Sequence, residues 1–549
     1  MTSQPQLSPT PAPADLAGVA MPGTQAPLLD SPPGAATATL VEPAPVAVQA
    51  PVRRGLWWFL GSPARKPLLL GLVGSLVLLF GGLGAGGVLE HDPVLGGTPL
   101  EALRFGHGYN IAVAISYLGL ALLVWGWVLL GRDVLAKRAG GRAVLSTAVV
   151  WTLPMIITPP LFTRDPYSYL AYGTLPLHGF DPYTYGPDML SGPIQQNVHW
   201  FWQDTPAPYG PLFIAVAKAV ASVTGGNMIL GVIAIRLVLL TGLVMLVAAL
   251  PGLVQHLGGR VSVALWLAVA NPVMVVHLVG GPHNDLLTVG LLSSGTLLVL
   301  NRKHAAGIAL VTLAAAVKAT AAIALPFLVL VWAARMASGS RNSRIVKAAA
   351  AGIAVFVAAF AACSVVAGVG LGWLPALNAP SNIVNWLSLP TGVGQLIYTA
   401  TNWLFNGLPQ TPFITVTRVL GGLLFLAIGA KQWLAARDGG PDGVDAVRRA
   451  GVVLLLFPLL SPATLPWYFS WGMALLAAVA WSARGMAITI FVSIFLIVAA
   501  FPDGEVSLYA FGYLALVLAG ALVAAISLRK PDPLGIRRRR RATAPAIDG

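Results

Sequence analysis

One stretch of the chain places an acidic residue and several aromatic residues in a pattern that could do chemistry. Asp165 follows an apolar segment directly, Tyr169 follows one helical turn later, and Gly-Phe-Asp-Pro-Tyr occupies residues 179–183. Asp165 should therefore sit at or just beyond a bilayer surface, where low-dielectric surroundings raise the pKa of a carboxyl group and suit it to act as a base. Asp followed by Pro is also a common helix start, so helix capping is the alternative explanation.

The composition is that of a polytopic membrane protein. Of the 549 residues, 56% are hydrophobic and only 9% are charged, whereas soluble domains carry roughly 25% charged residues. Repeated apolar runs of about 17 to 25 residues predict an all-α integral membrane protein with about 14 transmembrane helices. The lone cysteine, Cys363, lies in an apolar run and is expected to be inert packing.

The positive charge follows the positive-inside rule. With the N-terminus cytoplasmic, most of the 33 basic residues fall in cytoplasmic loops and tails. The net charge of +14 is then explained by topology and anionic lipid headgroups, so no nucleic-acid partner is expected. We expect a disordered Pro/Ala-rich cytoplasmic tail at 1–52, a membrane domain at 53–530 and a basic cytoplasmic tail at 531–549.

On this topology the polar residues capable of chemistry converge on the outer face of the membrane. The outer segments are the long loops 163–208 and 372–411 and the turns at His283, Lys318 and Trp467. The segment 209–224 is interpreted as an interfacial or re-entrant helix, because it is short, opens with Pro-Tyr-Gly-Pro and contains Lys218. This convergence is the strongest functional signal in the sequence.

These features together resemble the GT-C glycosyltransferases, multi-spanning enzymes that use polyprenyl-phosphate sugars on the outer face of the membrane. The resemblance rests on Asp165, the aromatic-rich stretch that follows it and the Gly-Phe-Asp-Pro-Tyr element. The later motifs are Tyr209-Gly210-Pro211-Leu212, His283-Asn284-Asp285, Lys318 followed by Pro326, and Pro466-Trp467-Tyr468. The combination looks most like the actinobacterial polyprenol-phosphomannose-dependent α-(1→6)-mannosyltransferases of lipomannan and lipoarabinomannan assembly.

The resemblance implies a GT-C fold, covering about residues 60 to 530, in the plasma membrane with the active site on the outer face. Mannose would pass from a polyprenyl-phosphate-mannose donor to a lipid-linked mannan acceptor, without a cofactor. Asp165 would be the general base, and a β-linked donor would give an α-(1→6) product with inversion. The alternatives are a polyprenyl-linked sugar transporter or flippase and a GT-C enzyme that uses another polyprenyl-phosphate sugar.

A lipid monophosphate leaving group needs positive charge or strong hydrogen-bond donors. The candidates for binding this donor phosphate are Lys318, His283, Arg236, Arg418 and Arg164. Arg236 and Arg418 lie in the outer part of predicted spanning segments, where an unpaired charge is costly and suggests function; snorkelling or pairing with an acid is the alternative. Asp285 could hold the orientation of His283, with helix capping and metal ligation as alternatives. Because Lys, Arg and His suffice for this leaving group, we expect no metal.

The remaining candidates are aromatic and polar residues that would bind the sugar or the acceptor. They are Tyr169, Asp181, Tyr183, Trp200, Trp202, Tyr209, Asn284, Asp285, Trp467 and Tyr468. An interfacial aromatic belt explains some of the Trp and Tyr residues. The density of Trp200-Phe201-Trp202 favours a binding wall for a sugar and a polyprenyl chain.

Overall fold

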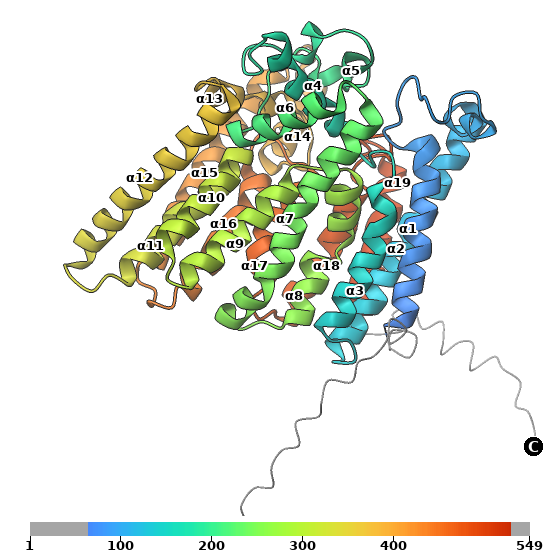
Figure 1. The fold of residues 1–549 in the computed structure, drawn as a ribbon. Coiled ribbons are helices and arrows are strands. Elements are labelled where there is room, and N and C mark those ends of the chain that lie inside the picture. The colour runs from blue at the N-terminus through green and yellow to red at the C-terminus, as the bar shows by residue number, and fades with distance from the viewer. Residues whose placement is uncertain (1–63, 529–549) are drawn as a thin grey trace, which may run out of the picture. The chain divides into compact units, whose positions relative to one another are not determined.

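Helices form the regular structure of residues 64–528, the part of the chain that the computed structural model describes (Figure 1). Within this part there is no β-strand, and the only extended pairings are two isolated bridges. The predicted all-α class is therefore confirmed. The tails expected at 1–52 and 531–549 lie outside the described residues.

Several of these helices are long and apolar enough to cross a bilayer. They are α1 (Arg65–Ala85), α2 (Gly106–Leu135), α7 (Met228–Leu257), α12 (Arg341–Ala367) and α15 (Thr411–Arg437). The pair α8 (Val261–Ala268) and Val273–Gly280 bends by 50° and makes a sixth span if it is counted as one. The chain is thus a membrane protein, while the expected total of about fourteen spans stays a prediction.

Shorter apolar helices complete the bundle. They are α3 (Gly141–Thr152), α6 (Pro211–Thr224), α9 (Asp285–Leu300), α10 (His304–Val317), α11 (Leu325–Ala334), α18 (Ala483–Ile497) and α19 (Phe511–Ser527). The other α-helices of the described residues are α4 (Asp165–Thr174), α5 (Pro193–Gln196), α13 (Trp373–Ala376), α14 (Leu389–Phe405), α16 (Val444–Leu460) and α17 (Phe469–Leu476). In Figure 1, α4, α5, α6 and α13 gather at one end of the bundle, and the turn between α11 and α12 lies at the other.

Small residues let the helices approach closely, as is common in membrane bundles. Between α1 and α2, a Cβ added at Gly74 would lie 2.6 Å from the backbone nitrogen of Leu123, and one at Gly119 would lie 2.6 Å from that of Leu78. The same device positions α4, because a Cβ at Gly173 would lie only 2.2 Å from the carbonyl oxygen of Ala217 in α6. The glycine therefore sets the distance between α6 and the helix that carries Asp165.

Substituting Gly173→Ala should lower the thermal stability of the purified protein. The new methyl group would meet backbone that cannot rotate away, and overpacking of this kind costs about 1–3 kcal/mol. Gly422→Ala is the matched control, since a Cβ at Gly422 in α15 meets nothing within 4 Å, and Ala favours a helix over Gly. Thermal unfolding in detergent checks the comparison, and equal melting temperatures for the two variants would contradict the close approach of α4 and α6.

Candidate active site

A cavity of about 1460 Å³, open to solvent, lies at the end of the bundle where α4 begins. Most of its walls come from the segments that the sequence assigns to one face of the membrane, and residues 499–508 complete them. The predicted site residues that line it are Asp165, Arg164, Trp200, Trp202, Tyr209, Lys318, Trp467 and Tyr468. The fold thus brings together residues more than 300 positions apart in the chain.

Asp165 is the first residue of α4, and its carboxylate caps no N–H group of that helix. The N–H of Asp165 instead donates to Thr163 Oγ1 at 3.0 Å, and the side chain is 22% exposed toward the cavity. Burial raises the pKa of Asp165 to about 6, against the lowering effects of Lys318 and the Thr163 hydroxyl. The residue is therefore a carboxylate at neutral pH whose pKa suits a base.

His283 presents an unused nitrogen to Asp165. Its Nδ1 lies 2.7 Å from the carbonyl oxygen of His277, and because a carbonyl can only accept, Nδ1 carries the hydrogen. Burial lowers the pKa of His283 well below its usual value, so the ring is neutral and Nε2 holds a lone pair. Nε2 is fully buried, has no hydrogen-bond partner among the described residues, and lies 3.6 Å from Asp165 Oδ2. That is the separation expected of two acceptors with no proton between them.

The ring of His283 is held flat against Trp467. The two ring centroids are 3.6 Å apart and the planes differ by 26°. We expected Asp285 to orient His283. Instead, the carbonyl of His277 and the ring of Trp467 orient His283. The carbonyl of His277 is available because this residue lies among the last four of the helix Val273–Gly280, where carbonyls lack helical partners.

Asp285 holds Lys318 instead. Lys318 Nζ lies 2.8 Å from Asp285 Oδ2, and the indole N–H of Trp471 donates to Asp285 Oδ1. Asp285 is completely buried, and its carboxylate does not cap α9. Lys318 Nζ also lies 4.6 Å from the ring centroid of Tyr468. The ammonium group is thus fixed in the cavity wall with N–H donors left for a ligand.

Asn284 and Tyr169 lie behind this wall. Asn284 is completely buried, and neither Oδ1 nor Nδ2 of its side chain has a hydrogen-bond partner among the described residues. Its backbone N–H donates to the hydroxyl of Tyr169 at 3.4 Å. Tyr169 packs edge-on against Tyr209, with ring centroids 5.3 Å apart. The capping that would explain Asn284 is absent, since its side chain makes no bond to α9.

Three predicted phosphate-binding arginines donate to backbone carbonyls. Arg164 lines the cavity, but its guanidinium donates to Val88 O at 3.1 Å and Asn197 O at 3.2 Å. Arg418 donates to Ser381 O and Ile383 O, both at 2.6 Å. These bonds hold in place the loop segment that forms one wall of the cavity. Arg418 itself does not line the cavity.

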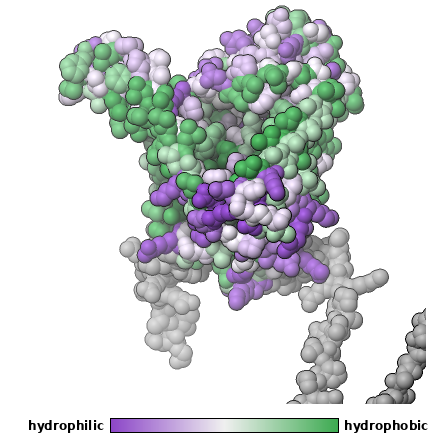
Figure 2. Space-filling model, turned by 90° about the vertical axis from the view of Figure 1, so that its left-hand side faces the viewer, coloured by the Kyte–Doolittle hydropathy of each residue, from purple (hydrophilic) through white to green (hydrophobic). Residues whose placement is uncertain are grey.

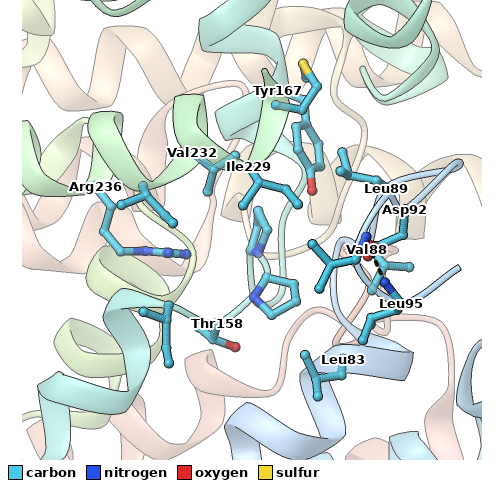
Figure 3. Close-up of a pocket in the computed structure, with 16 residues that line it drawn as sticks. Leu83, Val88, Leu89, Asp92, Leu95, Thr158, Tyr167, Ile229, Val232 and Arg236 are labelled. Atoms are coloured by element: carbon cyan, nitrogen blue, oxygen red, sulfur yellow. Dashed lines mark hydrogen bonds between the residues drawn. The ribbon is translucent and has the colours of Figure 1, made fainter. Parts of the chain in front are cut away.

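Arg236 lines a different cavity, which it shares with Tyr167 of α4 (Figure 3). Its guanidinium donates to Val279 O at 2.9 Å, Gly280 O at 2.8 Å and Ile156 O at 2.6 Å. Two of these acceptors end the helix Val273–Gly280, where carbonyls lack helical partners. Arg236 therefore caps that helix end from inside the bundle, and the structure does not bring it to Asp165.

Asp181 and Tyr183 also lie outside the cavity. Asp181 accepts the backbone N–H of Tyr183 at 3.0 Å and so closes its own turn. The hydroxyl of Tyr183 donates to Tyr209 O at 2.9 Å. These two residues shape the long loop, and through Tyr209 they support the cavity wall.

Two ionisable residues that the sequence analysis did not select also line the cavity. His199 Nε2 lies 3.1 Å from Glu505 Oε1. Glu505 stands between the last two helices, in a segment that the expected topology places on the same face as Asp165. That placement was a usable signal, whereas His199 had none beyond its position next to Trp200.

The described residues therefore define a membrane protein with one cavity lined by aromatic side chains. The carboxylate of Asp165 and the ammonium group of Lys318, which is paired with the buried Asp285, both face this cavity. The sequence matches the family described as alpha-(1->6)-mannopyranosyltransferase, N-terminal domain, over residues 68–334, and the MptB C-terminal domain over residues 390–530. The chain belongs to this alpha-(1->6)-mannopyranosyltransferase family and is a mannosyltransferase. The transporter interpretation is thereby set aside in favour of the transferase.

Relatives from Mycobacterium and Corynebacterium are named alpha-(1->6)-mannopyranosyltransferase A or B. The chain is 40% identical over 492 residues to alpha-(1->6)-mannopyranosyltransferase A of Mycobacterium tuberculosis, covering 88% of this chain and 93% of that protein. It is 32% identical to alpha-(1->6)-mannopyranosyltransferase A of Corynebacterium glutamicum, over 72% of this chain and 84% of that protein. It is 30% identical to alpha-(1->6)-mannopyranosyltransferase B of the same organism, over 76% of this chain and 73% of that protein. No solved structure matches the chain.

Proposed function

We propose that this enzyme is a GT-C glycosyltransferase that transfers mannose from polyprenyl-phosphate-mannose to a lipid-anchored mannan on the outer face of the plasma membrane. It forms α-(1→6) linkages with inversion, with Asp165 as general base. The observation that carries the proposal is that Asp165 and Lys318 line one cavity with Trp467 and Tyr468. A base for the acceptor, a cation for the departing phosphate and flat surfaces for sugars are what this reaction needs.

In the proposed reaction the acceptor 6-hydroxyl oxygen attacks the anomeric carbon of the donor mannose. The bond from that carbon to the phosphate oxygen breaks, and polyprenyl phosphate leaves with the electron pair. Lys318, fixed by Asp285, stabilises the charge that develops on the phosphate. The hydroxyl proton passes to Asp165, and attack opposite the leaving group converts a β-linked donor into an α-linked product.

His283 stabilises Asp165 once that residue has taken the proton. While Asp165 is ionised, its Oδ2 and the lone pair on His283 Nε2 face each other without a bond. Protonation of Asp165 supplies the missing hydrogen, so the carboxylic acid can donate to Nε2. A hydrogen bond to the neutral form of an acid raises its pKa and makes it a stronger base.

The acidic limb of the pH profile tests this arrangement. Asp165 must be ionised to act, so kcat/KM should fall as the pH drops through about 6, the pKa to which burial raises this group. His283→Phe keeps a ring against Trp467 but removes the acceptor, so the limb should move about one unit lower, the size of one net hydrogen bond. A protonated His283 would instead lower the pKa of Asp165, and its removal would move the limb higher.

The donor class is tested in membranes from a strain that lacks the native enzyme. Polyprenyl-phosphate-mannose and a short α-(1→6)-mannoside should yield an elongated product, and GDP-mannose offered to membranes depleted of polyprenol should yield none. Parallel assays with a polyprenyl-phosphate arabinose or glucose decide whether mannose is the sugar that the enzyme transfers. Transfer from GDP-mannose without a lipid carrier would overturn the proposed donor, and transfer of another sugar alone would overturn the assignment to mannose from this carrier.

A further inference from the structure

We propose that a second binding site, for the phosphate of an anionic membrane lipid, lies at the end of the bundle away from α4. Here α12 begins at Arg341 and α15 ends at Arg437, beside the turn from α11 (Figure 1). A cavity of about 550 Å³ is lined by Arg341, Arg344 and Arg437 and by apolar side chains that include Leu330 and Ile345. The site does not depend on the proposed donor or acceptor.

The arginines of this cavity hold hydrogen-bond donors that no described residue accepts from. The Nε atoms of Arg344 and Arg437 are buried, and neither has an acceptor among the described residues. Buried donors are almost always paired in folded proteins, so two acceptors are missing here. The Nη1 atom of Arg344 donates to Met336 O at 3.2 Å.

The charge of the cavity is only partly balanced. Arg341 Nη2 lies 2.6 Å from Asp438, which is itself 66% exposed, and donates to Arg437 O at 2.8 Å. The guanidinium groups of Arg344 and Arg437 have no ion pair among the described residues. A ligand that completes the site must bring negative charge and several acceptor oxygens, and a phosphate group brings both.

The cavity is formed by a fixed loop. Pro441, which lines it, accepts a hydrogen bond from Arg335 Nε at 2.7 Å. The same guanidinium donates to Val299 O at 2.6 Å at the end of α9. The residues around the arginines are therefore held in place before any ligand arrives, which lowers the ordering cost of binding.

The surroundings favour a lipid over a free phosphate ion. In the apolar stretches of α12 and α15 that could cross the membrane, only 17% and 11% of the residues are buried inside the protein. Val346 and Leu434, which are 66% and 51% exposed, stand on these helices close to the arginines. Figure 2 shows a hydrophilic band at the lower end of this face, below a hydrophobic surface. An acyl chain can lie on the apolar surface while its phosphate meets the arginines.

Native mass spectrometry of the full-length protein in detergent tests the site. The probes are phosphatidylglycerol, phosphatidylcholine as the zwitterionic lipid, and inorganic phosphate. Wild type should retain phosphatidylglycerol through delipidation, and Arg344→Gln/Arg437→Gln should weaken its retention about tenfold or more, as the loss of charge-assisted bonds predicts. Arg448→Gln, at an exposed arginine at the same end of the bundle, should behave like wild type.

A milder pair of substitutions covers the case in which the Gln variants fail to fold. Arg344→Lys/Arg437→Lys keeps both charges but removes the Nε donors, and it should also weaken retention. Equal retention of phosphatidylglycerol by wild type and either folded double variant would overturn the site. Equal retention of phosphatidylcholine would overturn its selectivity for anionic lipids. Inorganic phosphate that displaces the lipid at millimolar concentration would show a free-phosphate site and overturn the assignment to a lipid.

Discussion

Asp165→Asn should lower the rate of mannosyl transfer by about 10³-fold, within the range that a positioned general base contributes. Asn keeps the size of the side chain and the backbone bond to Thr163, but it cannot take the proton of the acceptor hydroxyl. Donor binding should survive, because Lys318 and the aromatic wall are untouched. Initial rates with lipid donor and α-(1→6)-mannoside acceptor, at matched protein levels, check the expected loss.

Asp188→Asn is the matched control for this prediction. Asp188 lies in the same long loop and is exposed, so its substitution should leave the rate within a factor of about two, as most surface changes do. Wild-type rates in Asp165→Asn would remove this residue from the mechanism. Equal losses in both variants would instead indicate damage to the loop as a whole.

Lys318→Met should reduce both transfer and stability. It removes the cation that faces the donor phosphate, a loss of about 10²-fold or more by analogy with other transition-state donors. It also leaves the buried carboxylate of Asp285 without its partner at 2.8 Å, and breaking a buried pair on one side costs about 3–5 kcal/mol. Assays of transfer and of thermal unfolding should therefore change together in this variant.

The double variant Lys318→Met/Asp285→Asn separates the two effects. Asn at 285 retains an oxygen for the indole N–H of Trp471, and no unpaired charge remains buried. The melting temperature should return most of the way to the wild-type value, while transfer should stay low because the cation is still absent. Recovery of transfer in the double variant would show that Lys318 acts only through stability.

The class of the protein and the gathering of Asp165, Lys318 and Trp467 could be predicted from the sequence. Long apolar runs predict membrane helices because the bilayer admits little else. Because successive spans cross the membrane in opposite directions, counting them placed Asp165, Lys318 and Trp467 on one face. The structure brings all three to one cavity. These predictions depend on hydropathy and loop charge, which are readable residue by residue.

The partners of buried polar groups could not be predicted in this way. Arg236 and Arg418 look alike in sequence, as costly charges in apolar segments, yet both donate to backbone carbonyls that irregular segments leave free. Likewise, the Nδ1 of His283 meets the carbonyl of His277, which is left free near the end of the irregular helix Val273–Gly280. Local irregularities of this kind follow from tertiary packing and leave no periodic signal.

In the proposed reaction, one cavity holds a β-linked lipid donor while Asp165 activates an acceptor that attacks opposite the phosphate. The most direct measurement is a single-turnover reaction of the purified enzyme with isotopically labelled β-polyprenyl-phosphate-mannose, followed by NMR of the product. Wild type should form one α-(1→6)-linked mannose and one polyprenyl phosphate per turnover, and Asp165→Ala should form neither. A β-linked product, or the same turnover in Asp165→Ala, would contradict it.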